Sequence, residues 1–152
     1  MPSRRAARRV QSDSAEATEA LGAALAAELG AGEVVVIGGE IGAGKTTFVR
    51  GACRALGVSA PVNSPTFAIG QRYPAPVPVS HLDLFRVEDL LAEDPDLLAD
   101  YLGQETISFI ELPPQSGVSL AAIRREVARF ATLAVVISLE HAGGDRRIVE
   151  ID

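Results

Sequence analysis

The chain has 152 residues, of which 47% are hydrophobic and 22% charged, and its formal net charge is −6. This size and composition indicate one globular domain spanning residues 1–152. The negative charge argues against a protein that grips a nucleic-acid backbone by itself, because such binding depends on Lys and Arg. Cys53 is the only cysteine, and no apolar stretch approaches the length of a membrane span. We therefore expect no internal disulfide, no membrane contact and a reducing, cytoplasmic location.

The N-terminal residues predict a short arm followed by a helix. Residues 1–10 are rich in arginine and lack the apolar segment of a secretory signal, so they are expected to form a flexible basic arm or the lead-in to a first strand. A contact with nucleic acid is the less favoured alternative for this arm. Asp13 is then expected to cap a helix, with Glu16 reaching back to the amide of the cap and Gly30 near the helix end.

A strand, a glycine-rich loop and a second helix are expected next. Residues 34–37 form a β-branched run that is typical of a strand buried on both faces of a parallel sheet. Glycines follow it immediately, and residues 45–56 favour a helix that ends at Gly57. This order is the structural context that a phosphate-binding loop requires.

The remaining elements follow from hydrophobic periodicity and from the positions of proline and glycine. Strands are expected at residues 66–72, 77–84, 107–110, 133–139 and 147–151, the last as an edge strand. Helices are expected at residues 87–102, interrupted near Pro95, and at residues 119–130. The two strands between residues 66 and 84 are expected to be antiparallel. The pattern predicts an α/β class: a three-layer, P-loop NTPase-like fold with a central mixed, mostly parallel sheet flanked by helices and an antiparallel portion.

Residues 39–46 read Gly-Glu-Ile-Gly-Ala-Gly-Lys-Thr and satisfy the pattern G-x-x-x-x-G-K-[ST]. Glycines let the backbone curl so that its N–H groups face inward around an anion, and Lys45 adds a cation against the β- and γ-phosphates. The hydroxyl of Thr46 is placed to ligate Mg²⁺. A glycine turn with a surface lysine is the alternative. ATP and Mg²⁺ are the expected ligands, and the expected binding residues are Gly39, Glu40, Ile41, Gly42, Ala43, Gly44, Lys45, Thr46 and Thr47.

Residues 39–51 closely resemble the loop of the TsaE (YjeE) family. Three more blocks resemble that family in the same order, and they are residues 64–67 (Ser-Pro-Thr-Phe), residues 81–86 (His-Leu-Asp-Leu-Phe-Arg) and Glu111 with Leu112-Pro113. The resemblance implies an ATPase that works with the TsaD and TsaB proteins to form the threonylcarbamoyl group on adenosine 37 of transfer RNAs that read ANN codons. Transfer RNA is then contacted only indirectly, through the complex.

The same resemblance implies roles for three residues outside the loop. Thr66 becomes a switch-like residue near the γ-phosphate, and Asp83 and Glu111 become acidic groups that act on Mg²⁺ or its water. The expected catalytic residues are therefore Lys45, Thr66, Asp83 and Glu111, and the expected metal ligands are Thr46, Asp83 and Glu111. Mg²⁺ prefers oxygen ligands, which agrees with this set.

Each acidic residue also has a plainer interpretation. Asp83 is equally suited to cap a helix that begins near residue 87, and Glu111 to be an exposed residue before a proline turn. His81 is expected as a packed core residue, with a catalytic base as the less favoured alternative. Leu112 stands where the family commonly has an aromatic residue, which leaves the base preference of the site open.

Hydrolysis by the isolated chain is expected to be slow, because the sequence offers no convincing arginine finger or water-orienting glutamine. Two other functions remain open: a small-molecule kinase with Asp83 as base, and a binding switch controlled by nucleotide occupancy. A regulatory GTPase is disfavoured. Lys45 is the only lysine, so the chain has no Asn-Lys-x-Asp motif for guanine recognition.

Overall fold

The structure is a computed structural model, and it describes residues 7–40, 43–63, 70–84, 96–112 and 120–152. The strands are β1 (Arg8–Ser12), β2 (Glu33–Gly39), β3 (Gly70–Tyr73), β4 (Val79–Asp83), β5 (Ile107–Leu112), β6 (Thr132–His141) and β7 (Arg147–Ile151). The helices are α1 (Ala15–Ala26), α2 (Lys45–Ala55) and α4 (Leu120–Ala128), with a short 3-10 helix η1 (Leu97–Asp100).

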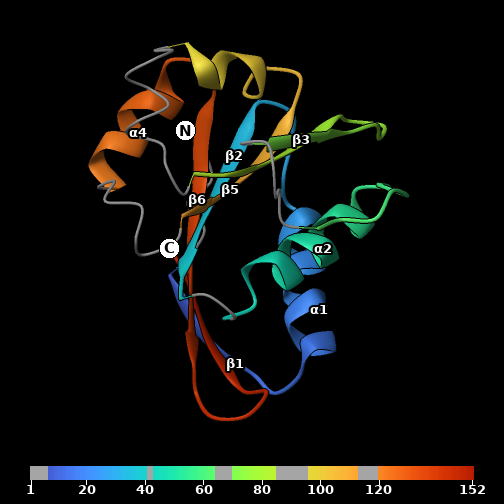
Figure 1. Ribbon diagram of the computed structural model, residues 1–152, viewed down its shortest axis with the longest axis vertical. Helices are drawn as coiled ribbons and strands as arrows, with labels where there is room; N and C mark the ends of the chain where they lie inside the picture. Colours follow the sequence, from blue (N-terminus) through green and yellow to red (C-terminus); the bar gives the residue numbers. More distant parts are fainter. Residues whose placement is uncertain (1–6, 41–42, 64–69, 85–95, 113–119) are drawn as a thin grey trace.

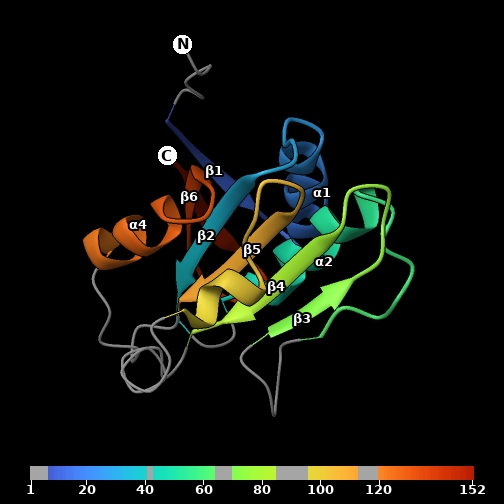
Figure 2. The same cartoon turned by 90° about the horizontal axis from the view of Figure 1, so that it is seen from above.

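The described strands form one mixed sheet in the order β1-β7-β6-β2-β5-β4-β3 (Figure 1). The four central strands β6, β2, β5 and β4 are parallel to their neighbours within this group. The pairs at the two sides of the sheet, β3–β4, β6–β7 and β1–β7, are antiparallel. Helices α1 and α2 cover one face, and α4 covers the other (Figure 2). The predicted α/β class and mixed sheet are confirmed, including the antiparallel pairing of β3 and β4.

Strand β2 lies at the centre of the sheet and is buried on both faces, as its β-branched run predicts. Val35 and Ile37 pack into the cluster under α1 and α2. Val34 and Val36 point the other way, into the cluster that includes residues of η1 and α4. None of these four side chains is more than 1% exposed. The loop that follows β2 therefore starts from a rigid position.

Helices α1 and α2 are in backbone contact through two glycines. A Cβ atom built on Gly22 would lie 2.1 Å from the carbonyl oxygen of Phe48, and one on Gly51 would lie 2.0 Å from that of Glu19. Only glycine allows such an approach, which explains a poor helix former in the middle of α2. Because α2 begins at the loop, this contact also anchors the loop helix.

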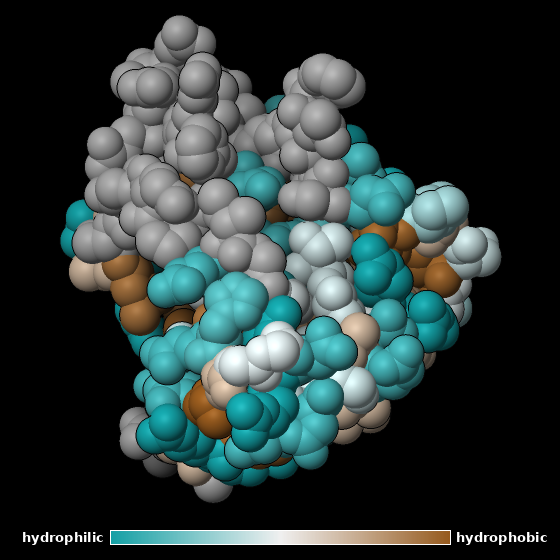
Figure 3. Space-filling model, turned by 60° about the horizontal axis from the view of Figure 1, so that its bottom comes forward, coloured by the Kyte–Doolittle hydropathy of each residue, from teal (hydrophilic) through white to brown (hydrophobic). Residues whose placement is uncertain are grey.

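The surface of the described part is largely polar. Leu120 is the large hydrophobic side chain that stands out as exposed there, at 38%. The face seen in Figure 3 is mostly hydrophilic, with small separate hydrophobic areas. None of the described helices has both the length and the apolar character needed to cross a membrane.

At the two ends of the chain, the structure agrees with one open alternative and contradicts one expectation. Residues 8–10 belong to β1, which agrees with residues 1–10 as the lead-in to a first strand; residues 1–6 lie outside the described part. Strand β7 is not an edge strand, because β1 pairs with its outer side and β6 with its inner side. The largely exposed, polar strand β1 carries too little hydrophobic alternation to be recognised from sequence.

The N-cap predicted for the first helix, Asp13, is one residue too early. Ser14, with an extended backbone at φ −156°, is the N-cap, and its side chain accepts a hydrogen bond from the Ala17 amide at 3.0 Å. Asp13 instead accepts a hydrogen bond from Gln11 Nε2 at 2.7 Å. The helix expected at residues 87–102 lies largely outside the described residues. Within the described part of that range, the structure has the 3-10 helix η1.

Candidate functional site

The candidate site lies at one edge of the sheet, where the parallel strands β2, β5 and β4 end. Glu111 on β5 is in register with Ile37 on β2 and with Asp83 on β4. Residues in register point to the same face of a sheet, so both carboxylates lie on the face that α1 and α2 cover. The glycine loop leaves β2 at Gly39, next to this pair. Ligands of open α/β sheets bind at such strand ends.

The loop begins and ends at glycines whose backbone needs the absence of a side chain. Gly39 has φ 146°, and a Cβ atom there would lie 2.4 Å from the carbonyl oxygen of Leu139. Gly44 has φ 97° and is the N-cap of α2, where no side-chain cap hydrogen bond is made. The first amides of α2 are thus left for another acceptor, which makes this end of the helix suited to an anion. Ile41 and Gly42 lie outside the described residues.

The side chain of Lys45 is hydrogen-bonded to the start of this loop. Its Nζ donates to the carbonyl oxygens of Gly39 at 2.5 Å and Glu40 at 3.0 Å, and the residue is 9% exposed. An ammonium group has three N–H bonds, and these contacts use two of them. Burial lowers the pKa of Lys45, while the negative charges of Glu111 and Asp83 act to raise it. The ammonium group of Lys45 is therefore close enough to both carboxylates for their charges to act on it.

Thr46 and Glu111 are in direct contact. The Thr46 hydroxyl oxygen lies 3.1 Å from Oε1 and 3.1 Å from Oε2 of Glu111, so its proton is shared between the two carboxylate oxygens. Glu111 is only 2% exposed. The alternative of an exposed glutamate before a proline turn is therefore wrong.

His81 lies beneath this pair and is fully buried. Its Nε2 is in hydrogen-bond contact with Glu111 Oε2. Its Nδ1 has no hydrogen-bond partner among the described residues. His81 is therefore a packed residue, as expected, but it is packed against the candidate site.

The structure brings together Lys45, Thr46, Asp83 and Glu111 from three elements that are distant in sequence. Gly39, Glu40, Ala43, Gly44 and Thr47 stand in the loop and first turn of α2 as the motif requires. Thr66 lies outside the described residues, and so do the residues after Leu84 that a cap at Asp83 would serve. The structure places the site residues that it describes, and the roles of all of them, like that of Thr66, remain predictions.

Oxygen atoms dominate the ligands that this corner offers to a cation. The Thr46 hydroxyl and the Glu111 carboxylate already lie within 3.1 Å of each other, and Asp83 is the register neighbour of Glu111. Within the described segments, no group of three or more His, Cys, Asp or Glu side chains forms a metal-binding cluster. Because its donors are hydroxyl and carboxylate oxygens, the set fits the ligand preference of Mg²⁺, which takes few protein oxygens and completes its shell with phosphate and water.

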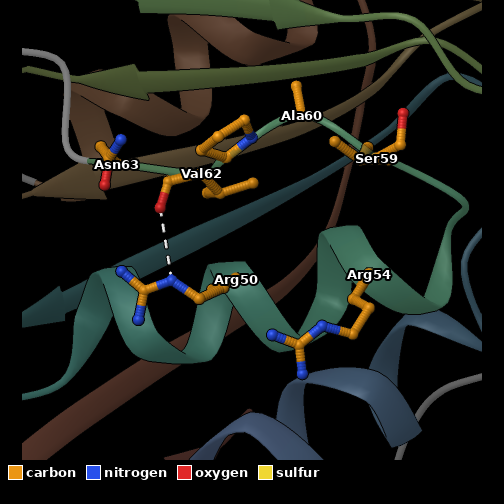
Figure 4. A pocket seen from close by; sticks show the side chains of 8 residues that line it. Arg50, Arg54, Ser59, Ala60, Val62 and Asn63 are labelled. Atoms are coloured by element: carbon orange, nitrogen blue, oxygen red, sulfur yellow. Dashed lines mark hydrogen bonds between the residues drawn. The ribbon is translucent and has the colours of Figure 1, made fainter.

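A pocket of about 350 Å³ lies between α2 and the segment that follows it in the chain (Figure 4). It is lined by Arg50, Arg54, Val58, Ser59, Ala60, Pro61, Val62 and Asn63. Arg50 Nε donates to the carbonyl oxygen of Val62 at 3.3 Å, and Arg54 Nη1 donates to Glu19 Oε2 at 3.0 Å. The sequence did not predict the hydrogen bond between Arg50 and Val62. Its acceptor is a backbone carbonyl, which every residue type has, so no sequence motif marks it.

Comparison with known proteins identifies the family of this chain. Residues 12–147 match the sequence model of the family described as "Threonylcarbamoyl adenosine biosynthesis protein TsaE". Two proteins named "tRNA threonylcarbamoyladenosine biosynthesis protein TsaE" are each 40% identical to this chain. The one from Bacillus subtilis aligns over 98 residues, 63% of this chain and 60% of the relative. The one from Streptomyces coelicolor aligns over 94 residues, 60% and 64% respectively. The chain thus spans less than two thirds of the length of these relatives.

A solved structure has the same architecture. The crystal structure of Bacillus subtilis YdiB superposes with a TM-score of 0.71 at 25% sequence identity. The match covers 96% of this chain and 84% of YdiB. The likeness therefore extends over nearly all of the α/β fold, well beyond the loop motif.

Proposed function

The chain belongs to the TsaE family, and we propose that it binds ATP with Mg²⁺ and hydrolyses it slowly in the pathway that forms the threonylcarbamoyl group on adenosine of transfer RNA. The observation that carries the proposal is the contact between Thr46 on α2 and the buried Glu111 at the end of β5. This contact joins the loop hydroxyl to a strand-end carboxylate, which is how P-loop proteins prepare a site for Mg²⁺ against two phosphates.

Phosphate binding would come from the loop and from Lys45. The start of α2 offers backbone amides without a side-chain cap at Gly44. Lys45 offers its ammonium beside the carbonyls of Gly39 and Glu40. Such donors, held in place before the substrate arrives, stabilise the negative charge that develops during phosphoryl transfer.

Thr46, Glu111 and Asp83 would hold Mg²⁺. Bound there, the cation supplies charge neutralisation between the β- and γ-phosphates. Glu111 is positioned by its contact with Thr46, and Asp83 is its neighbour in register. Burial of this corner strengthens each electrostatic interaction, because the local dielectric constant is low.

The relatives that match this chain are named for the biosynthesis of threonylcarbamoyladenosine in transfer RNA. By family membership we place this chain in the same process, in the cytoplasm, with the TsaD and TsaB proteins as partners. The modified position would be adenosine 37 of transfer RNAs that read ANN codons. The net charge of −6 supports contact with the RNA through those partners.

The proposal is tested by ATP and GTP turnover with Mg²⁺, measured for wild type and Lys45→Ala, alone and with TsaD, TsaB and transfer RNA. Arg129→Ala is the control, because Arg129 follows α4 on the opposite face of the sheet. We expect slow ATP turnover by the chain alone, stimulation by the partners, and loss of both in Lys45→Ala but not in Arg129→Ala.

Two results would point elsewhere. Phosphate transfer to a small hydroxyl compound would favour a kinase. Tight ATP-dependent binding to the partners without any turnover would favour a nucleotide-controlled binding module.

A further inference from the structure

His81 has an unusual position for a buried histidine: among the described residues, the one hydrogen-bond contact of its ring is with a carboxylate of the candidate site. It lies in the middle of β4 in register with Phe109 on β5. Glu111 is two residues further along β5, on the same face of the sheet. The ring therefore reaches diagonally to Glu111 Oε2 from the strand that also carries Asp83. This geometry depends on the parallel register of the two strands.

A buried carboxylate needs hydrogen-bond donors, because charge without partners is costly in the interior. Glu111 has two donors among the described residues, namely the Thr46 hydroxyl and the His81 ring. A hydroxyl can ligate a cation through a lone pair and still donate its one proton, so Thr46 stays a donor to Glu111. That proton is shared between Oε1 and Oε2, whereas the His81 ring contacts Oε2 alone and so fixes which way the carboxylate is turned.

We propose that His81 is a positioning residue for Glu111, holding the carboxylate toward Thr46 so that the two can share one Mg²⁺. The inference rests on the proposed function. A role as catalytic base is disfavoured by two observations: the side chain is 0% exposed, and Nε2, the nitrogen that faces the site, is already engaged by Glu111. Nδ1 has no partner among the described residues that would relay a proton onward.

Three substitutions of His81 distinguish a role in positioning Glu111 from a role in packing alone. His81→Gln places an amide nitrogen near the position of Nε2 and retains a donor for Glu111. His81→Asn is equally polar, but its amide nitrogen reaches only the position of Nδ1. His81→Leu removes both nitrogens and leaves the buried Glu111 without this donor, which also lowers stability.

The readout is the affinity for a fluorescent ADP analogue, N-methylanthraniloyl-ADP, measured in Mg²⁺ and in EDTA, together with the melting temperature. ADP avoids turnover. The ratio of Kd in EDTA to Kd in Mg²⁺ reports the contribution of the cation. Removing a residue that orients a metal ligand costs about 10–100-fold in metal affinity. We expect this ratio to fall by about that factor in His81→Leu and His81→Asn and to stay near the wild-type value in His81→Gln, with Kd in EDTA unchanged.

A packing role predicts something different: lower melting temperatures with the same affinity ratio in every folded variant. That result, or a fall in His81→Gln equal to that in His81→Asn, would overturn the positioning role while leaving the proposed function intact. If wild type itself showed no Mg²⁺-dependent affinity, the proposed function would fail and the positioning role with it. Should His81→Leu not fold, the Gln and Asn pair decides the question.

Discussion

Thr46 Oγ1 lies 3.1 Å from each carboxylate oxygen of Glu111, and this contact ties the first turn of α2 to the end of β5. The two residues are 65 positions apart in the chain. Their meeting depends on the parallel pairing of β5 with β2, because β2 leads directly into the loop that starts α2. The site is therefore a product of sheet topology as much as of the loop motif.

Replacing Glu111 with glutamine tests the carboxylate while keeping its size. We expect the Mg²⁺-dependent part of the affinity for ADP to fall by about tenfold or more, equivalent to about 1.4 kcal/mol, because one oxygen becomes an amide donor and the charge is lost. Isothermal titration calorimetry with and without Mg²⁺ measures this. The matched control is Glu105→Gln at an exposed position outside the site. Equal affinity ratios in the two variants would exclude Glu111 as a ligand.

The lowered pKa of Lys45 predicts a pH dependence of stability. Because burial lowers this pKa below 10.5, the unfolded chain binds the proton more readily than the folded chain does. Stability therefore rises with pH between the lowered pKa and 10.5. The nucleotide-free Lys45→Met variant lacks this titration.

We expect the free energy of unfolding of wild type, minus that of Lys45→Met, to increase as the pH is raised toward 10.5. Urea unfolding at several pH values gives this difference, in which the titration of other groups cancels. A difference that stays constant, or that decreases with pH, would show that Lys45 is not desolvated in the folded protein.

The close contact of α1 with α2 predicts that Gly51→Ala is destabilising, although alanine favours helices. The new Cβ atom would lie 2.0 Å from the carbonyl oxygen of Glu19, so the helices must move apart. Overpacking of this kind costs about 1–3 kcal/mol. Gly30→Ala is the control, since the atom nearest to its Cβ is 3.8 Å away. Thermal unfolding of both variants checks this, and equal melting temperatures would contradict the contact.

Cys53 is predicted to be unreactive in the folded protein. It is fully buried on α2, and burial raises the pKa of its thiol to about 12. The nucleophile is the thiolate, which is then scarce at neutral pH. Because it is the only cysteine, one labelling event per chain reports on it. We expect modification by iodoacetamide at pH 8 to appear only with urea unfolding; rapid labelling of the native chain would disprove the burial.

The central strand and the glycine loop could be predicted from the sequence, for physical reasons. The β-branched run at residues 34–37 is typical of a strand buried on both faces, and glycines after it allow the turn that Gly39 and Gly44 make. Glu111 directly follows the strand predicted at residues 107–110, and Asp83 lies near the end of the strand predicted at residues 77–84. Their expected role at the site came from the resemblance to the TsaE family, since position alone left the plainer alternatives open.

Other features depend on information that a local pattern does not contain. Strand β1 is held by its pairing with β7 and is largely exposed, so it has no hydrophobic signal of its own. Whether Asp13 or Ser14 caps α1 depends on where β1 ends, which is at Ser12. The contact of His81 with Glu111 is diagonal across two strands, so it requires the register, which no single sequence segment carries.

A crystal structure with ADP and Mn²⁺ tests the proposed site most directly, because the anomalous scattering of Mn²⁺ locates the cation. We expect the β-phosphate in the loop between Gly39 and Lys45, and one cation at Thr46 Oγ1 on the side of Glu111. Phosphates bound elsewhere, or a cation peak away from both Thr46 and Glu111, would contradict the proposed site.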